Sequence, residues 1–118
     1  MLIRKQVPLP GRTDDRVMTE YMLRDYKVKA GEMEDWLKEW SEKIYPLRLK
    51  MGFKVLGAWK VGDDRFVWIL SHDGKKGEFE KANERYYSSK ERKAIRPDPA
   101  RHLAEVRHWM MEDVLPGP

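Results

Sequence analysis

The sequence predicts an α+β domain with a ferredoxin-like βαββαβ protomer, in which a four-stranded antiparallel sheet has both helices on one face. Two observations and one general rule predict this class. Segments rich in β-forming residues alternate with segments of helical periodicity, in the order strand, helix, strand, strand, helix, strand. The two middle strands are joined tightly enough to form a hairpin. Right-handed crossovers then place both helices on the same side of the sheet.

The first half of the chain is expected to form a strand and an interrupted helix. Residues 17–28 (VMTEYMLRDYKV) have the composition and length of a strand. Pro46 has no backbone N–H, so we expect the following helix to kink or restart near Tyr45. Gly52 then occupies the C′ position that ends a helix. The helix itself is predicted by apolar residues at three- and four-residue steps, namely Met33, Trp36, Leu37, Trp40, Ile44, Leu47 and Met51.

The second half is expected to supply three strands and one helix. The segment RPDPARH contains two prolines and should end that helix. The predicted ranges are strands at 53–61 and 65–72, a helix at 75–95 and a strand at 104–115. We therefore divide the chain into an extended arm (1–16), one domain (17–115) and a short tail (116–118).

Composition limits the classes of function. The 118 residues are 41% hydrophobic, which suits a single core. The 24 basic and 20 acidic residues nearly balance, so charge alone does not indicate a nucleic-acid partner. The absence of cysteine excludes disulfides and thiolate chemistry and fits the cytoplasmic location that we expect. No apolar run approaches the roughly 20 residues of a membrane span, and no signal-peptide pattern begins the chain.

The hairpin GFKVLGAWKVGDDRFVWILSHDG (52–74) is apolar on both faces. If Asp63 and Asp64 are the central turn residues, Trp59 faces Trp68 across the hairpin. Helices can cover only one face, and two exposed tryptophans of about 150–250 Å² each would leave a large apolar patch. We therefore expect a homodimer in which the open sheet face packs against its two-fold mate.

Three segments resemble the NIPSNAP family of the dimeric α/β-barrel superfamily. They are LRDYKVKAG (23–31), YPLRLKMGFKVLGAWKVGDDRFVWILSHDG (45–74) and ERYYSSKERK (84–93). The resemblance runs from Tyr21 to Trp109 and implies a ferredoxin-like protomer that pairs through its sheet. Met22 replaces an acidic residue often found two positions before the strand arginine, and Ala30-Gly31 replaces Pro-Gly. The superfamily includes cofactor-independent oxygenases, haem-degrading monooxygenases and isomerases, so the resemblance selects no single reaction.

The first and third strands contain the candidate polar site residues. Arg24 lies near the middle of the first strand, where it either anchors an anion or carbonyl group of a ligand or forms an internal ion pair with Glu20 or Asp113. Tyr26 shares its face and could move a proton. His72, at the end of the third strand, is the general-base candidate, against the alternative of an edge histidine without function.

Aromatic residues form the second part of the candidate site. Trp36, Trp40, Tyr45, Trp59 and Trp68 could line a pocket for a flat organic ligand, although the same spacing suits core or interface. The three histidines, His72, His102 and His108, show no metal-ligand spacing, so we expect no metal. His108 could in principle ligate haem as in haem-degrading relatives, but no other feature supports it. We expect no cofactor.

These observations favour a protein that binds a small, largely apolar organic molecule and could act as a cofactor-independent oxygenase, isomerase or proton-transfer enzyme. The alternative is a non-catalytic ligand-binding or assembly module of the same fold. RNA binding is less favoured, because the third strand reads RFVWILSH and lacks the basic-Gly-aromatic run of RNA-recognition domains.

Overall fold

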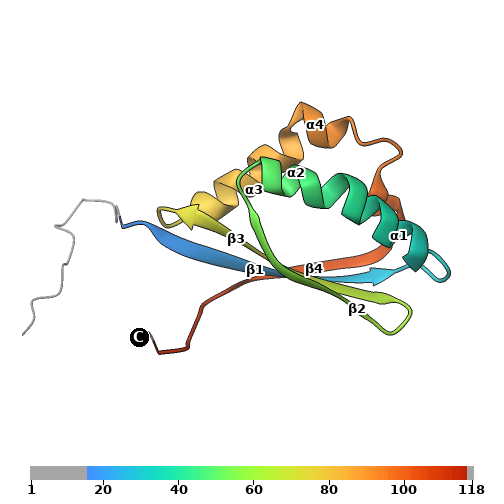
Figure 1. Ribbon diagram of the computed structural model, residues 1–118, viewed down its shortest axis with the longest axis horizontal. Coiled ribbons are helices and arrows are strands. Elements are labelled where there is room, and N and C mark those ends of the chain that lie inside the picture. The colour runs from blue at the N-terminus through green and yellow to red at the C-terminus, as the bar shows by residue number, and fades with distance from the viewer. Residues whose placement is uncertain (1–15, 117–118) are drawn as a thin grey trace, which may run out of the picture.

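The computed structural model describes residues 16–116, and these form one antiparallel sheet with helices on a single face (Figure 1). The strands are β1 (Met18–Val28), β2 (Lys54–Val61), β3 (Arg65–Gly74) and β4 (Leu103–Met111), and their order in the sheet is β2-β3-β1-β4. The helices are α1 (Met33–Glu39), α2 (Tyr45–Lys50), α3 (Glu78–Ser88) and α4 (Lys90–Lys93). The predicted ferredoxin-like fold is confirmed. Most of the predicted arm, and residues 117–118 of the tail, lie outside the described residues.

A π-helical turn, η1 (Trp40–Ile44), joins α1 to α2 at the predicted interruption. The backbone N–H of Tyr45 donates to the carbonyl of Trp40, five residues earlier. Pro46 follows and cannot donate a helical hydrogen bond, and its ring would press on the carbonyl four residues before it. The wider turn relieves that conflict and lets the helix continue, as the kink prediction anticipated.

The turn after α2 is fixed by a Schellman motif centred on Gly52. This residue has φ +95°, and its N–H donates to the carbonyl of Leu49 at 3.1 Å. The N–H of Phe53 donates to the carbonyl of Arg48 at 3.0 Å. These two bonds are the ones that define the motif, and they confirm Gly52 as the predicted C′ residue.

The hairpin register differs from the prediction by one residue. Val61 pairs with Arg65, so the loop contains three residues, Gly62-Asp63-Asp64, in place of a two-residue turn. Gly62 adopts φ +61°, which a glycine accommodates without strain. Trp59 consequently pairs with Val67 and not with Trp68. The predicted pairing of the two tryptophans is wrong, and they lie on opposite faces of the sheet.

The face of the sheet under the helices forms the core. Alternate residues of β1 and β3 point into it, and its largest buried side chains include Trp36, Trp68, Phe66, Phe79 and Tyr86. The core also contains a charged side chain, because Arg48 is only 1% exposed. Among residues 16–116, no helix is both long and apolar enough to cross a membrane.

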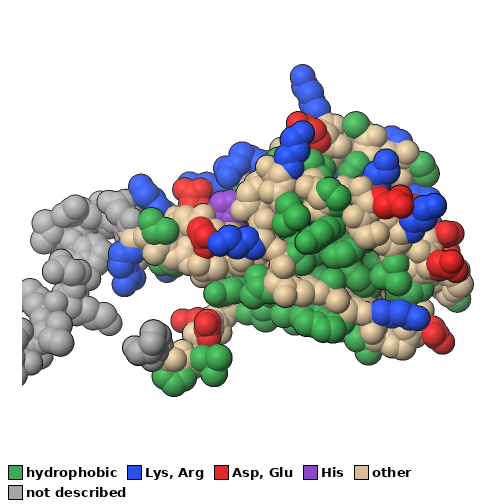
Figure 2. Space-filling view, viewed as in Figure 1, with side chains coloured by type: hydrophobic (Ala, Val, Ile, Leu, Met, Phe, Trp, Pro, Cys, Tyr) green, Lys and Arg blue, Asp and Glu red, His purple; other side chains and the backbone are tan. Residues whose placement is uncertain are grey.

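The opposite face of the sheet has no covering layer in the described chain (Figure 1). In the register, Leu23 is flanked there by Ile69 on β3 and Trp109 on β4. Trp59 and Trp109 are about half exposed, at 51% and 48%. Hydrophobic side chains gather along this lower side of the molecule in the space-filling view (Figure 2).

Replacing Gly52 tests the cap. We predict that Gly52→Ala lowers the free energy of unfolding by about 1 kcal/mol, because an L-residue is strained at this positive φ. Gly52→Asn should cost less, since asparagine tolerates the left-handed region. Urea unfolding monitored by circular dichroism measures both. Equal stability of the alanine variant and the parent would contradict the assigned role.

Candidate functional site

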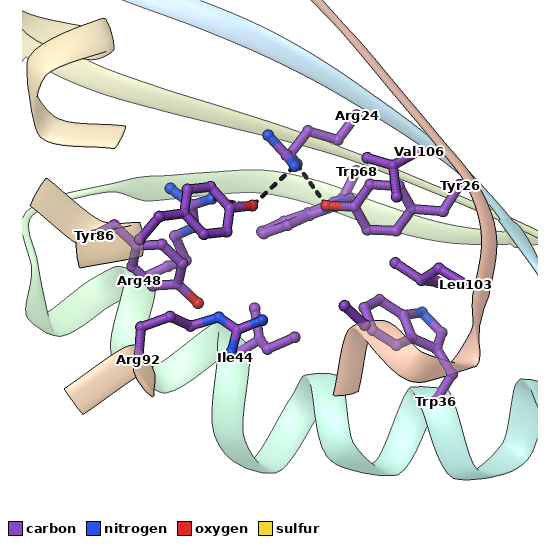
Figure 3. Close-up of a pocket in the computed structure, with 12 residues that line it drawn as sticks. Arg24, Tyr26, Trp36, Ile44, Arg48, Trp68, Tyr86, Arg92, Leu103 and Val106 are labelled. Carbon is purple, nitrogen blue, oxygen red and sulfur yellow. Dashed lines mark hydrogen bonds between the residues drawn. The ribbon is translucent and has the colours of Figure 1, made fainter. Parts of the chain in front are cut away.

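A cavity of about 220 Å³ lies between the sheet and the helices (Figure 3). The sheet contributes Arg24, Tyr26 and Trp68 to its lining, while the helices contribute Trp36, Arg48 and Tyr87. Its volume is below the roughly 300–1,000 Å³ of pockets for drug-sized molecules. The cavity therefore suits a small molecule.

Arg24 is buried on β1 with tyrosine hydroxyl groups around it. Its Nε donates to the hydroxyl of Tyr26 (Figure 3), and its Nη2 donates to the hydroxyl of Tyr87 at 2.9 Å. Neither predicted ion pair is present. Glu20 instead accepts hydrogen bonds from the backbone N–H groups of Gly77 and Phe79 at the start of α3.

Arg48 extends from α2 into an aromatic cage. Its guanidinium carbon lies 3.7 Å from the ring centroid of Tyr86 and 4.7 Å from that of Phe53. Nη1 donates to Asn83 at 2.8 Å, and Nη2 donates to the hydroxyl of Tyr87 at 3.3 Å. Tyr87 therefore accepts hydrogen bonds from two guanidinium groups.

Several polar groups around the cavity lack a partner in the described part of the chain. They are the Nε atoms of Arg48 and Arg92, the hydroxyl of Tyr86 and the indole N–H groups of Trp36 and Trp68. Buried polar groups in native proteins are almost always hydrogen-bonded to protein, water or ligand. These donors are buried among the residues that line the cavity.

Burial keeps the surrounding tyrosines neutral. It raises the pKa of Tyr86 to about 12, although the charges of Arg48 and Arg92 act in the opposite direction. Burial likewise raises the pKa of Tyr26, against the opposing influence of Arg24. At neutral pH both hydroxyl groups consequently retain their protons and cannot balance a guanidinium charge.

The structure brings together only part of the predicted site. Arg24, Tyr26 and Trp68 line the same cavity. Trp40 and Tyr45 stack on each other with centroids 5.3 Å apart, outside the lining, and Trp40 contacts the ring of Trp68. We predicted that Trp59 lies in this wall. The three-residue loop shifts the pairing of the strands by one residue, so Trp59 lies on the other face of the sheet.

The predicted general base lies away from the cavity. His72 packs against the ring of Phe53 with centroids 5.2 Å apart, near Gly52, and is absent from the lining. His108 pairs with Arg24 in the register but is exposed on β4. No group of histidine and acidic side chains among residues 16–116 is arranged to hold a metal ion.

Sequence reasoning missed Arg48, Tyr87 and Arg92. Arg48 does carry a signal, since it continues the four-residue row of Trp36, Trp40 and Ile44 on the buried helix face. Arg92 shows no comparable signal, because it lies in a charged helix and is held by Asp98 at 2.9 Å.

His102 fixes one wall of the cavity to α1. Its Nδ1 lies 2.7 Å from Glu32 and its Nε2 lies 2.9 Å from Glu39, at the two ends of the helix. Arg101 also donates to both oxygens of Glu39, at 2.8 and 2.9 Å. Both ring nitrogens face carboxylates, so both contacts are hydrogen bonds when the ring is protonated. The next residue, Leu103, lines the cavity.

Comparison with known proteins agrees with this architecture. Residues 21–100 match the family model NIPSNAP. An uncharacterized NIPSNAP domain protein from Burkholderia xenovorans superposes with a TM-score of 0.72 at 16% identity, covering 86% of this chain and 99% of the other. A NIPSNAP family protein from Agrobacterium tumefaciens gives 0.70 at 11% identity, covering 80% and 92%.

A third structure extends the likeness beyond that family. The "Putative antibiotic biosynthesis monooxygenase" from Nitrosomonas europaea gives a TM-score of 0.61 at 16% identity, covering 85% of this chain and 94% of the other. At these identities the superpositions establish the fold alone. No curated protein matches the sequence.

The His102 contacts predict a specific pH dependence. Burial lowers the pKa of His102, but the hydrogen bonds to Glu39 and Glu32 outweigh it and raise the pKa above its ordinary 6.5. The hydrogen bonds of the protonated His102 ring therefore stabilise the folded state fully below pH 6.5. This stabilisation is lost as the pH rises through the raised pKa. We predict that His102→Gln costs about 2 kcal/mol of unfolding free energy at pH 6 and less at pH 9.

Urea unfolding of both proteins between pH 6 and 9 measures this difference. His108→Gln is the matched control, because this exposed histidine forms no salt bridge with a carboxylate among residues 16–116 and its replacement should change little. A loss for His102→Gln that stays constant over the range would show that the charge on the ring is unimportant.

Proposed function

Since this chain belongs to the NIPSNAP family, we propose that it binds a small, largely apolar organic molecule in the cavity between sheet and helices. The cavity itself is the observation on which the proposal rests. Its walls combine aromatic rings, such as Trp36 and Trp68, with a few polar groups, which is typical of small-molecule sites.

A cofactor-independent enzyme is the more specific form of this proposal. Tyr26 has a neutral hydroxyl held by Arg24 beside the cavity, where it could exchange a proton with a ligand. Oxygenation, isomerisation and proton transfer all fit such a group. The alternative is a non-catalytic binding or assembly module. His72 is no longer favoured as the base, because it is outside the lining.

We also propose that the open sheet face pairs with a second copy of the chain in the cytoplasm. Leu23, Val67, Ile69 and the half-exposed Trp59 and Trp109 lie on this face. Soluble proteins rarely expose so many large apolar side chains together. A two-fold axis would bring this same face of both copies into contact.

Cavity binding predicts a small-molecule adduct on protein purified gently and measured by native mass spectrometry. Val106 lines the cavity and is 47% exposed, so phenylalanine there should fill space without disrupting the core. We expect Val106→Phe to reduce the adduct population at least fivefold. Val114→Phe, at a position 85% exposed and outside the lining, should leave it unchanged. Equal occupancy in both variants would place the ligand elsewhere.

Dimerisation predicts that a charge on the open face separates the subunits. Trp109→Glu should weaken association by roughly 100-fold, because pairing would bury an unbalanced carboxylate. Leu49→Glu is the control, since Leu49 is a partly exposed apolar residue on α2, on the helix side. Sedimentation equilibrium measures both. A monomeric parent protein at micromolar concentration would refute the dimer.

A further inference from the structure

Two buried guanidinium groups at the cavity have no carboxylate partner. Arg24 is 4% exposed and Arg48 is 1% exposed, and neither forms an ion pair within residues 16–116. Other arginines of the chain do. Arg65, Arg92 and Arg101 each contact a carboxylate at 2.7 to 2.9 Å. The two most deeply buried arginines of the described residues thus lack a carboxylate partner, the reverse of the usual expectation.

The acceptors around these two cations are neutral. Both guanidinium groups donate to the single hydroxyl of Tyr87, so two like charges share one acceptor. Burial lowers the pKa of Arg48, and the nearby Arg24 charge also lowers it. An arginine remains protonated at neutral pH even so. Two positive charges consequently face the cavity without a balancing negative charge from the described chain.

Three partly buried acidic side chains of the domain are engaged with other groups. Glu20 holds the backbone at the start of α3, and Asp98 holds Arg92. Asp25 belongs to the other face of the sheet, where it accepts from Arg65 at 2.7 Å. A counterion for Arg24 and Arg48 can therefore come from a ligand.

We propose that the cavity binds an organic carboxylate, with its oxygens between Arg24 and Arg48 and its apolar part against Trp36 and Ile44. This inference rests on the proposed function and specifies the class of ligand. A guanidinium fork matches a carboxylate with two parallel hydrogen bonds. The hydroxyl of Tyr87 accepts from both arginines and so keeps its own proton for donation to the ligand.

The small volume and mixed walls limit the ligand further. An anion with a short apolar body fits about 220 Å³, whereas a nucleotide does not. Trp36 and Tyr26 meet edge to face at 5.6 Å between centroids, and this surface suits a flat or compact apolar group. The ligand class is therefore a small aromatic or aliphatic monocarboxylic acid.

Benzoate and benzamide provide the test, because they share shape and differ in charge. Each is titrated into the full chain while the indole N–H signals are followed by NMR. We expect the signals of Trp36 and Trp68 to shift, since both line the cavity. Trp59 and Trp109, on the opposite face, serve as internal controls. Benzoate should bind at least tenfold more tightly than benzamide.

Variants identify the groups that distinguish the two probes. Arg24→Met and Arg48→Met should each abolish the tenfold preference for benzoate, whereas Lys38→Met, an exposed position on α1, should preserve it. Arg48→Lys should retain only part of the preference, because the ammonium lacks the planar fork. If an arginine variant fails to fold, the affinities of benzoate and benzamide for the unaltered protein still test the carboxylate assignment.

The outcomes separate this inference from the proposed function. Equal binding of both probes at the cavity would overturn the carboxylate assignment and leave the organic-ligand site standing. A tenfold preference that survives in both Arg→Met variants would also overturn it. Absence of binding by either probe, together with the absence of an adduct in native mass spectrometry, would overturn both proposals.

Discussion

The hydrogen-bonded bridge from Arg24 through Tyr87 to Arg48 organises the interior of this protein. It links β1, α3 and α2, so the sheet and both helical regions meet at one hydroxyl group. Arg48 adds aromatic stacking on Phe53 and Tyr86. The two guanidinium groups repel each other. Each buried charge needs solvent, an aromatic ring face or an anion next to it.

Two local features of the chain place Arg48 at this position. Pro46 imposes the π-helical turn, which changes the direction of the side chains that follow it. Gly52 then ends α2, and the cap ties the carbonyl of Arg48 to the N–H of Phe53. The ring that stacks on the guanidinium is thus fixed by the same motif that holds the arginine backbone. The cap that ends α2 therefore also sets the surroundings of the Arg48 guanidinium.

Local patterns in the sequence predict the elements well because each has a local cause. The proline predicts the interruption, the glycine predicts the cap, and β-forming residues predict β1. The hairpin register fails because both faces of the strands are apolar, so nothing in the pattern distinguishes a loop of two residues from one of three. That single residue transfers Trp59 from the cavity side to the open face. Arg48 was overlooked despite its place in the buried helical row, because arginine is rarely buried without a partner, and Tyr87 was overlooked because tyrosine is intermediate in burial.

The alternation along β1 connects the cavity to the open face. Arg24 and Tyr26 point beneath the helices, while Leu23 and Asp25 point to the other side. A partner pressed against Leu23 would restrain the strand that positions Arg24, since neighbouring residues share one backbone. Rigid placement of a guanidinium group lowers the entropic cost of binding an anion. Pairing through the open face and ligand binding in the cavity would then reinforce each other, with β1 as the shared element.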